Sequence, residues 1–206
     1  LDGIEPIGIG FDIYSELNSI IRKSSVNITQ CGYESFKPKR EYDLIFCINV
    51  FEHLPSWRNY ISEASKWLKK DGKLIILCPN YNFPYESHFF IPIILNKKIT
   101  KFFFGKYIKS FEKINNRIGL WDSLNLVKKS DVLKFLRINN FCFTDKTEII
   151  DIMINRISTD KEFNKRQSFV GMIGYFAMKF RILYLIKLFP RFLPYMFLEI
   201  KKNKSP

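Results

Sequence analysis

Residues 42–78 constrain the fold more than any other part of the chain. A nearly continuous apolar run at 42–49 is typical of a strand buried on both faces of a parallel sheet. Apolar residues at helical spacing follow over 57–68, with Ser56 as the expected N-cap, and a second apolar run at 74–78 predicts the next strand. A helix between two such strands joins parallel neighbours by a right-handed crossover, so the pattern predicts an α/β fold.

The flanking segments extend this pattern. Gly72 is expected in the left-handed position after the helix, and Ser130 is expected to cap a later helix. Further strands are predicted at 7–11, 26–31, 141–149 and 195–200. We therefore expect one domain over residues 1–206, with a doubly wound, mostly parallel sheet and helices on both faces.

Two segments interrupt this pattern. Residues 80–125 are rich in aromatic and basic side chains and contain two prolines, and residues 150–193 are mostly helical in pattern. Inserts between regular elements often shape binding sites, so we expect the first insert to contact the substrate. The second is expected to lie before the last strand.

The composition of the chain limits the kinds of partner and metal site that can be expected. The chain has 33 Lys and Arg against 20 Asp and Glu, a formal net charge of +13. This charge favours anionic partners, although lysines that only solvate the surface explain it equally well. The four cysteines show no zinc-ligand spacing and no disulfide framework, so we expect no metal site and a reducing, cytoplasmic location.

The apolar segments of the sequence are too short to cross a membrane. No window reaches the ~18 uninterrupted apolar residues that a span needs. The apolar runs at 169–178 and 183–197 are interrupted or followed by charges, which indicates amphipathic structure that packs on the core or contacts the inner membrane surface. The first residue is Leu1 and no signal peptide follows it, so we expect an upstream part to be missing.

One acidic residue lies at a position where proteins that bind nucleotide-type cofactors often have a carboxylate. Asp12 ends the strand predicted at 7–11, and ligands of open α/β sheets bind at the carboxyl ends of strands. A carboxylate at that place can accept hydrogen bonds from both hydroxyls of a ribose. The alternative role for Asp12 is that of a helix-capping acid.

The segment Gly10-Phe11-Asp12-Ile13 resembles the second-strand motif of class I S-adenosylmethionine-dependent methyltransferases. Other segments resemble the same family in the same order, and they are Tyr42-Asp43-Leu44-Ile45, Phe51-Glu52-His53-Leu54, Leu68-Lys69-Lys70-Asp71-Gly72-Lys73-Leu74-Ile75-Ile76, Pro79-Asn80, Asn125-Leu126-Val127 and Tyr195-Met196-Phe197-Leu198-Glu199-Ile200. The resemblance covers residues 7–143 well and the last third only in architecture.

The resemblance implies S-adenosylmethionine as cofactor, with Asp12, Ile13, Gly32, Tyr33 and Asn49 among its binding residues. Gly32 and Tyr33 stand where the family has an adenine-contacting acid, so a backbone amide and a stacking ring would replace it. The family's first strand and glycine-rich loop have no counterpart here. The chain alone is therefore expected to bind the cofactor poorly.

The candidate catalytic residues are the two histidines, His53 and His88. His88 lies in the loop after the fifth strand of the family, which faces the methyl donor, and an imidazole can deprotonate a hydroxyl acceptor. A packing role is equally open for His88, and the Glu52–His53 pair is often structural in this family. Tyr81 and Tyr85 are the expected substrate contacts.

The expected function is methyl transfer to a small-molecule, sugar or lipid-linked acceptor, most simply at a hydroxyl. Asn82-Phe83-Pro84-Tyr85 is similar to the asparagine, proline, proline, aromatic motif of nucleic-acid amino-methyltransferases but follows the wrong strand, so nucleic acid is disfavoured. Two alternatives remain. A nicotinamide-dependent oxidoreductase would share Asp12 without the segment at 51–54, and a methyltransferase-like scaffold would contact the membrane surface without catalysis.

Overall fold

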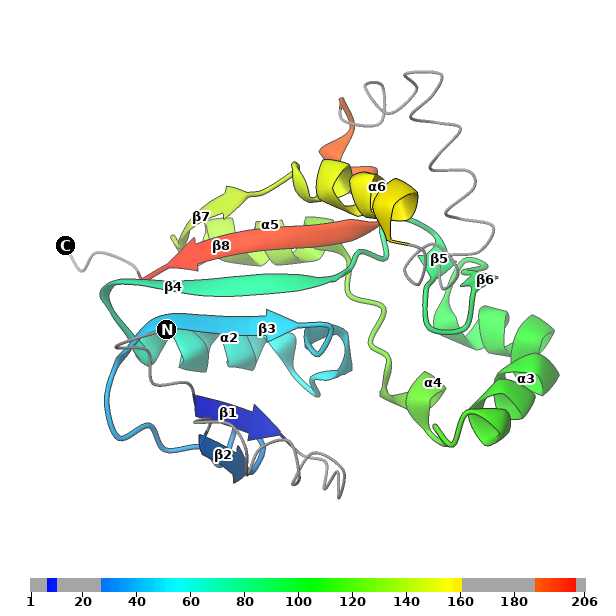
Figure 1. Ribbon diagram of the computed structural model, residues 1–206, viewed down its shortest axis with the longest axis horizontal. Coiled ribbons are helices and arrows are strands. Elements are labelled where there is room, and N and C mark those ends of the chain that lie inside the picture. The colour runs from blue at the N-terminus through cyan, green and yellow to red at the C-terminus, as the bar shows by residue number, and fades with distance from the viewer. Residues whose placement is uncertain (1–6, 11–26, 161–187, 203–206) are drawn as a thin grey trace. The chain divides into compact units, whose positions relative to one another are not determined.

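The computed structural model describes residues 7–10, 27–160 and 188–202 (Figure 1). These residues belong to two compact units, 1–41 and 42–206. In the first unit, β1 (Ile7–Gly10) pairs in parallel with β2 (Asn27–Gln30), as the sequence predicts. Asp12 and Ile13 lie outside the described residues.

The second unit is built on a four-stranded sheet with the order β3-β4-β8-β7. Strand β3 (Tyr42–Ile48) is parallel to β4 (Leu68–Pro79). Strand β8 (Tyr195–Lys201) is antiparallel to both β4 and β7 (Cys142–Asp145). The predicted α/β fold is therefore present, and its sheet is mixed because the last strand, β8, is antiparallel to both of its neighbours.

Strand β3 differs from its predicted environment. Leu44, Phe46 and Ile48 were expected to be buried, but they are 54%, 66% and 47% exposed. The reason is that the described residues cover only the other face of β3, where Cys47 is buried. Alternate residues of a strand point to opposite faces, so one covered face leaves every second side chain open.

Gly72 is not the left-handed residue that the sequence predicts. It lies within β4, which begins almost directly after the preceding helix. A Cβ at this position would lie 2.7 Å from the carbonyl oxygen of Tyr42 and 3.0 Å from the backbone nitrogen of Lys69. The glycine is needed here because two backbone segments approach it closely.

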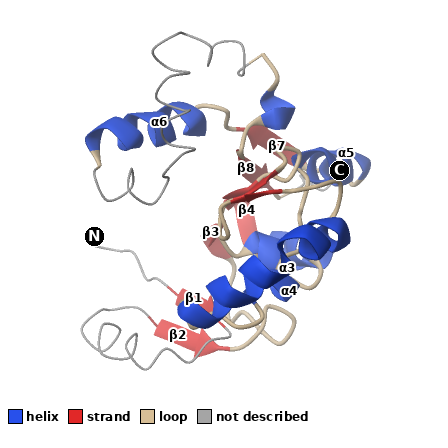
Figure 2. Ribbon diagram, turned by 90° about the vertical axis from the view of Figure 1, so that its right-hand side faces the viewer, coloured by secondary structure: helices blue, strands red, loops and turns tan. Residues whose placement is uncertain are grey.

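Helices cover both faces of the sheet. Helices α2 (Trp57–Lys66) and α5 (Lys129–Ile138) lie on one face and α6 (Ile149–Thr159) on the other (Figure 2). Rings of Trp57 and Phe135 meet edge to face at 5.5 Å between α2 and α5. The core between these helices and the sheet consists of fully buried apolar residues that include Ile61, Ala64, Leu74, Ile76, Val132, Leu136, Leu198 and Ile200.

The N-termini of α2 and α5 are capped by residues at different distances along the chain. The Ser56 side chain accepts from the backbone N–H of Asn59, so the predicted cap of α2 is confirmed. Ser130 does not cap α5, because the helix begins at Lys129. The first helical N–H groups of α5 donate instead to the side chains of Asn80 and Asn82, at 3.0 and 2.8 Å.

Residues 80–125 form a small subdomain beyond the carboxyl ends of β3 and β4 (Figure 1). It contains β5 (Tyr85–Glu86), β6 (Ile91–Pro92), α3 (Lys97–Ile114) and α4 (Leu120–Ser123). Its own apolar core holds Phe89, Ile91, Ile108, Trp121 and Leu124. A separate core gives this segment a defined shape at the edge of the sheet where ligands bind in open α/β folds.

The segment before the last strand is described in part. Strand β7 ends at Asp145, four residues before the predicted end, and α6 follows. The 3₁₀ helix η2 (Pro190–Phe192) then precedes β8. Within the described residues, no helix has the length and apolar character needed to cross a membrane.

Candidate functional site

The candidate site begins where β3 ends. Asn49 has a φ of 52°, a left-handed conformation that asparagine tolerates, and its N–H donates to the carbonyl of Leu77 on β4. The short 3₁₀ helix η1 (Phe51–His53) follows at once. This turn buries Glu52 completely while leaving the His53 side chain 23% exposed.

The carboxylate of Glu52 is buried at the carboxyl end of β3. Its side chain is fully inaccessible, and neither carboxylate oxygen has a partner among the described residues. Two imidazole nitrogens lie near its Oε1, the Nε2 of His53 at 3.9 Å and that of His88 at 3.8 Å. Burial raises the pKa of Glu52 to about 7, although the residue's own backbone N–H and, to a smaller extent, the nearby His88 oppose the shift.

His88 is oriented by Glu86. Its Nδ1 lies 2.6 Å from Glu86 Oε1, which also accepts the backbone N–H of His88 at 2.6 Å. A carboxylate only accepts, so this hydrogen bond assigns the proton of the neutral ring to Nδ1 and the lone pair to Nε2. Burial lowers the pKa of His88, but the hydrogen bond and charge of Glu86 outweigh it, and the net shift is upward.

His53 is oriented in the same way by Ser123. Its Nδ1 lies 2.8 Å from the Ser123 hydroxyl, which itself donates to the carbonyl of Leu120 at 2.8 Å. The hydroxyl proton is used in that bond, so Ser123 accepts from Nδ1–H and the Nε2 lone pair of His53 is free. Burial, together with the charge of His88, lowers the pKa of His53.

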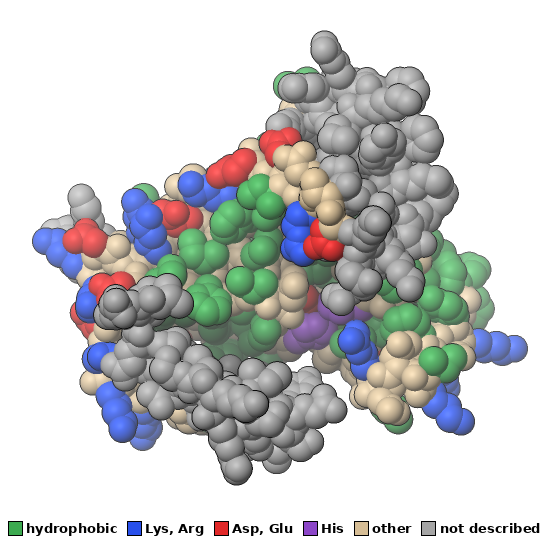
Figure 3. Space-filling view, viewed as in Figure 1, with side chains coloured by type: hydrophobic (Ala, Val, Ile, Leu, Met, Phe, Trp, Pro, Cys, Tyr) green, Lys and Arg blue, Asp and Glu red, His purple; other side chains and the backbone are tan. Residues whose placement is uncertain are grey.

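Three electron-pair donors therefore converge on one point. The two histidine rings pack edge to face at 5.3 Å and 75°, and each directs Nε2 toward Glu52. The histidine side chains (purple) reach the surface seen in Figure 3. Lone pairs that face each other in a buried site repel, so a hydrogen-bond donor, a shared proton or a cation between them would stabilise this arrangement. We call Glu52, His53 and His88 the histidine–glutamate cluster.

The expected substrate tyrosines occupy different environments. Tyr81 is only 5% exposed, and its hydroxyl donates to Glu86. Burial and the charge of Glu86 raise its pKa. Tyr81 thus supports the residue that orients His88, whereas Tyr85 is half-buried at the start of β5.

The expected cofactor residues are spread over both units. Gly32 and Tyr33 follow β2 in the first unit, where the Gly32 carbonyl accepts from the amides of Ser35 and Phe36, both at 3.1 Å, and Tyr33 is buried. Asn49 is exposed at the end of β3 in the second unit.

Sequence reasoning missed two residues of the site, Glu86 and Ser123. Glu86 had a local signal, since an acid two positions before a histidine can reach its ring. Ser123 had none, because it lies 70 positions from His53 along the chain. Its role follows only from the way α4 packs beside η1.

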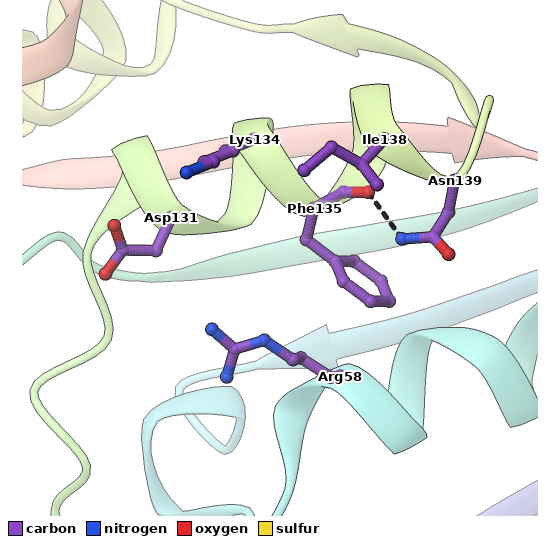
Figure 4. A pocket seen from close by; sticks show the side chains of 6 residues that line it. All are labelled: Arg58, Asp131, Lys134, Phe135, Ile138 and Asn139. Carbon is purple, nitrogen blue, oxygen red and sulfur yellow. Dashed lines mark hydrogen bonds between the residues drawn. The ribbon is translucent and has the colours of Figure 1, made fainter.

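A separate groove of about 410 Å³ lies between α2 and α5 (Figure 4). Arg58 from α2 faces the side chains of α5 across it, and the lining residues are Arg58, Asp131, Lys134, Phe135, Ile138 and Asn139. The groove shares no residue with the histidine–glutamate cluster. None of the residues predicted for the site lines it.

Comparison with protein families identifies the class of the chain. A family model described as a methyltransferase domain matches residues 5–120. The chain belongs to this methyltransferase family, so the resemblance found in its sequence motifs is confirmed. The match includes Asp12, the histidine–glutamate cluster and most of the subdomain at 80–125.

Curated relatives and solved structures agree with the family. The uncharacterized protein Rv1509 of Mycobacterium tuberculosis (strain H37Rv) is 30% identical over 172 residues, which cover 82% of this chain and 59% of the relative. The protein MT1557 of strain CDC 1551 matches to the same extent. The chain therefore spans about three fifths of the length of these curated relatives.

One similar solved structure is the plantazolicin methyltransferase BamL, bound to a triazolic desmethylPZN analog and SAH. Its TM-score is 0.54 and its sequence identity is 13%, and the alignment covers 99% of this chain and 70% of the BamL chain. A second is a Haemonchus contortus phosphoethanolamine N-methyltransferase 2, bound to phosphomonomethylethanolamine and S-adenosylhomocysteine. Its TM-score is 0.53 and its sequence identity is 15%, and the alignment covers 98% of this chain and 44% of that chain. At these identities the likeness establishes the fold.

Proposed function

We propose that the protein transfers a methyl group from S-adenosylmethionine to a hydroxyl of a small-molecule, sugar or lipid-linked acceptor. Membership of the methyltransferase family supports the reaction type, and the S-adenosylhomocysteine in both structural neighbours supports the cofactor. The observation that carries the hydroxyl assignment is the histidine–glutamate cluster at the carboxyl end of β3.

The cluster suits a hydroxyl better than an amine. A hydroxyl must lose or share its proton as its oxygen attacks the methyl group, whereas a neutral amine needs mainly correct positioning. His53 and His88 each present a free Nε2 beside a buried carboxylate, and both rings are partly accessible. A substrate hydroxyl that reached them would meet groups able to hold or polarise its O–H bond.

The subdomain at 80–125 is the proposed acceptor-binding segment. It supplies His88 and Glu86 to the cluster, and its half-buried Tyr85 provides an aromatic ring at the same end of the sheet. The two structural neighbours bind different molecules, a triazolic desmethylPZN analog and phosphomonomethylethanolamine. The residues of this chain, and not these neighbours, therefore support the acceptor assignment.

Removal of His88 tests the acceptor side of the proposal. We expect His88→Ala to lower turnover by roughly 100-fold or more, the scale of a lost proton-transfer group, with cofactor affinity nearly unchanged. His88→Asn, whose amide can still donate to Glu86, should show the same loss with less effect on stability. His53→Ala should instead disturb cofactor binding or stability. Full turnover of His88→Ala on a hydroxyl acceptor would remove His88 from the reaction.

Asp12 tests the cofactor side. We expect Asp12→Ala to weaken cofactor binding by about 1 to 3 kcal/mol, the scale for losing charge-assisted hydrogen bonds to the ribose. Calorimetry measures the change, and Glu34→Ala, an exposed acid in the same unit, serves as the matched control. An unchanged dissociation constant would leave Asp12 as a helix-capping acid.

We further propose that the protein touches anionic membranes through α3. Three large apolar side chains on this helix, Phe102, Phe103 and Ile114, are 83%, 63% and 77% exposed. The exposed lysines of the same helix are Lys98, Lys106, Lys109 and Lys113. Aromatic residues among lysines are typical of helices that lie on a membrane surface, and the helix belongs to the proposed acceptor-binding segment.

A further inference from the structure

We infer that Glu52, His53 and His88 form a binding site for a divalent transition-metal ion, with three protein ligands and open coordination positions. One ligand atom from each residue lies within 4.8 Å of the other two. The sequence pattern predicts no metal site, because the cysteines lack ligand spacing and His88 lies far along the chain from Glu52 and His53. The inference rests on four features of the cluster.

The first feature is the unsatisfied carboxylate. Glu52 is 0% exposed, and both its oxygens lack a hydrogen-bond partner among the described residues. Buried polar atoms in native proteins are nearly always paired, and a buried carboxylate without a partner is costly. The Nε2 atoms of His53 and His88 lie 3.9 and 3.8 Å from Glu52 Oε1, which is too long for hydrogen bonds. A cation between them satisfies all three groups.

The second feature is the support behind each imidazole. His88 Nδ1 is bonded to the Glu86 carboxylate and His53 Nδ1 to the Ser123 hydroxyl. Metal-binding histidines almost always donate the other ring N–H to such a partner, which fixes the tautomer and the ring orientation. Glu86 is held in turn by the Tyr81 hydroxyl and by the backbone N–H of His88.

The third feature is the geometry. Ligand atoms at ~2.1 Å from a tetrahedral ion lie roughly 3.4 Å apart. The 3.8 and 3.9 Å separations from Glu52 Oε1 are slightly longer, so a small inward rotation of each ring closes them. Both rings are also partly accessible, with 23% and 20% of the His53 and His88 side chains exposed, which leaves a path for an ion.

The fourth feature is the donor set, which indicates the class of ion. Two imidazoles and one carboxylate suit zinc, iron(II), cobalt(II) or manganese(II), whereas magnesium and calcium prefer oxygen ligands throughout. Three protein ligands leave positions for water or substrate, as in catalytic rather than structural sites. In the proposed methyl transfer, an open position would accept the acceptor oxygen and lower the pKa of its hydroxyl. That role rests on the proposed function, but ion binding does not.

Metal binding to the purified, untagged chain tests the inference without cofactor or acceptor. After dialysis against a chelator, we expect Zn²⁺ to bind with one-to-one stoichiometry by calorimetry, and Co²⁺ to give the visible absorption of a low-symmetry site with nitrogen ligands. Glu52→Gln and His88→Ala should each weaken binding by about 100-fold or more. Glu86→Gln should weaken it by roughly 10 to 100-fold, because Glu86 orients a ligand.

Glu63→Gln is the matched control, since Glu63 is a partly exposed glutamate on α2 that pairs with Lys66. Its affinity should equal that of the wild type. Glu52→Gln removes a buried charge, so its metal-free form should unfold at or above the wild-type temperature, and lost binding cannot then be attributed to unfolding. Equal Zn²⁺ affinity in wild type and Glu52→Gln, or no stoichiometric binding, would overturn the site and leave a shared proton as the charge in the cluster.

Activity separates this inference from the proposed function. A chelated protein that transfers methyl groups at the full rate would preserve the proposed function and remove the ion from the reaction. A protein that binds Zn²⁺ through Glu52 but transfers no methyl group to any hydroxyl acceptor would preserve the metal site and contradict the hydroxyl assignment.

Discussion

At the scale of single residues, burial decides which cysteines can react. Burial raises the pKa of the Cys47 thiol to about 12, against a smaller opposing effect of its hydrogen bond with Tyr60. Burial also raises the pKa of Cys78 well above its ordinary value. Cys142 on β7 is exposed. Only the thiolate is nucleophilic, so the three thiols should differ sharply in reactivity.

We predict that iodoacetamide at pH 8 modifies Cys142 in the native protein and leaves Cys47 and Cys78 intact. With a pKa of about 12, only roughly one Cys47 thiol in 10,000 is ionised at this pH. Mass spectrometry of peptides from native and denatured samples measures the difference. Modification of Cys47 as fast as Cys142 would mean that the covered face of β3 opens in solution.

At the scale of secondary-structure elements, a buried ion pair connects the start of α5 to the sheet. Lys129 is only 1% exposed, and its Nζ lies 2.6 Å from Asp145 at the end of β7. The same ammonium donates to the carbonyl of Pro190 in η2 at 3.0 Å. One side chain therefore holds three elements together at the end of the sheet.

We predict that Lys129→Ala lowers the free energy of unfolding by about 3 kcal/mol. Breaking a buried pair leaves an uncompensated charge, and the value lies at the low end of the usual range because Asp145 is partly exposed. Urea unfolding measures it. Lys134→Ala, which removes an exposed lysine of the same helix, should change stability by no more than about 0.5 kcal/mol. Similar losses in both variants would show that the buried ion pair makes no special contribution to stability.

At the scale of the whole molecule, the proposed membrane contact combines net charge with local structure. The net charge of +13 attracts the chain to any anionic surface, but among the α-helices that the structure describes only α3 places exposed aromatic rings among exposed lysines. Charge attraction weakens with salt, whereas apolar insertion does not. The two contributions can therefore be measured separately.

We predict that the protein sediments with phosphatidylserine-containing vesicles at low salt and much less at high salt, and does not sediment with neutral vesicles. The double variant Phe102→Ser, Phe103→Ser should bind more weakly at both salt concentrations because it loses the inserted rings. Ile138→Ser, which removes an exposed apolar residue from α5, should bind like the wild type. Equal sedimentation of all three proteins would reject α3 as the contact surface.

Local patterns in the sequence were sufficient for most of the fold. Apolar runs placed β3, β4 and β8, helical spacing and Ser56 placed α2, and the strand motifs identified the methyltransferase family. These features depend on residues a few positions apart, where side-chain direction and backbone sterics act directly.

Contacts between distant residues could not be predicted in this way. The start of α5 is satisfied by Asn80 and Asn82, about 48 positions earlier, and not by the serine beside it. Both histidines were recognised as candidates, but their convergence on the buried Glu52, with the other ring nitrogens held by Glu86 and Ser123, depends on how the subdomain at 80–125 packs against η1. The sequence alone thus determined which strands, helices and chemical groups this chain has, whereas only the tertiary structure decided which groups meet. The physical reason is that local sterics and periodicity act within one element, while a site is assembled from elements that the chain path brings together.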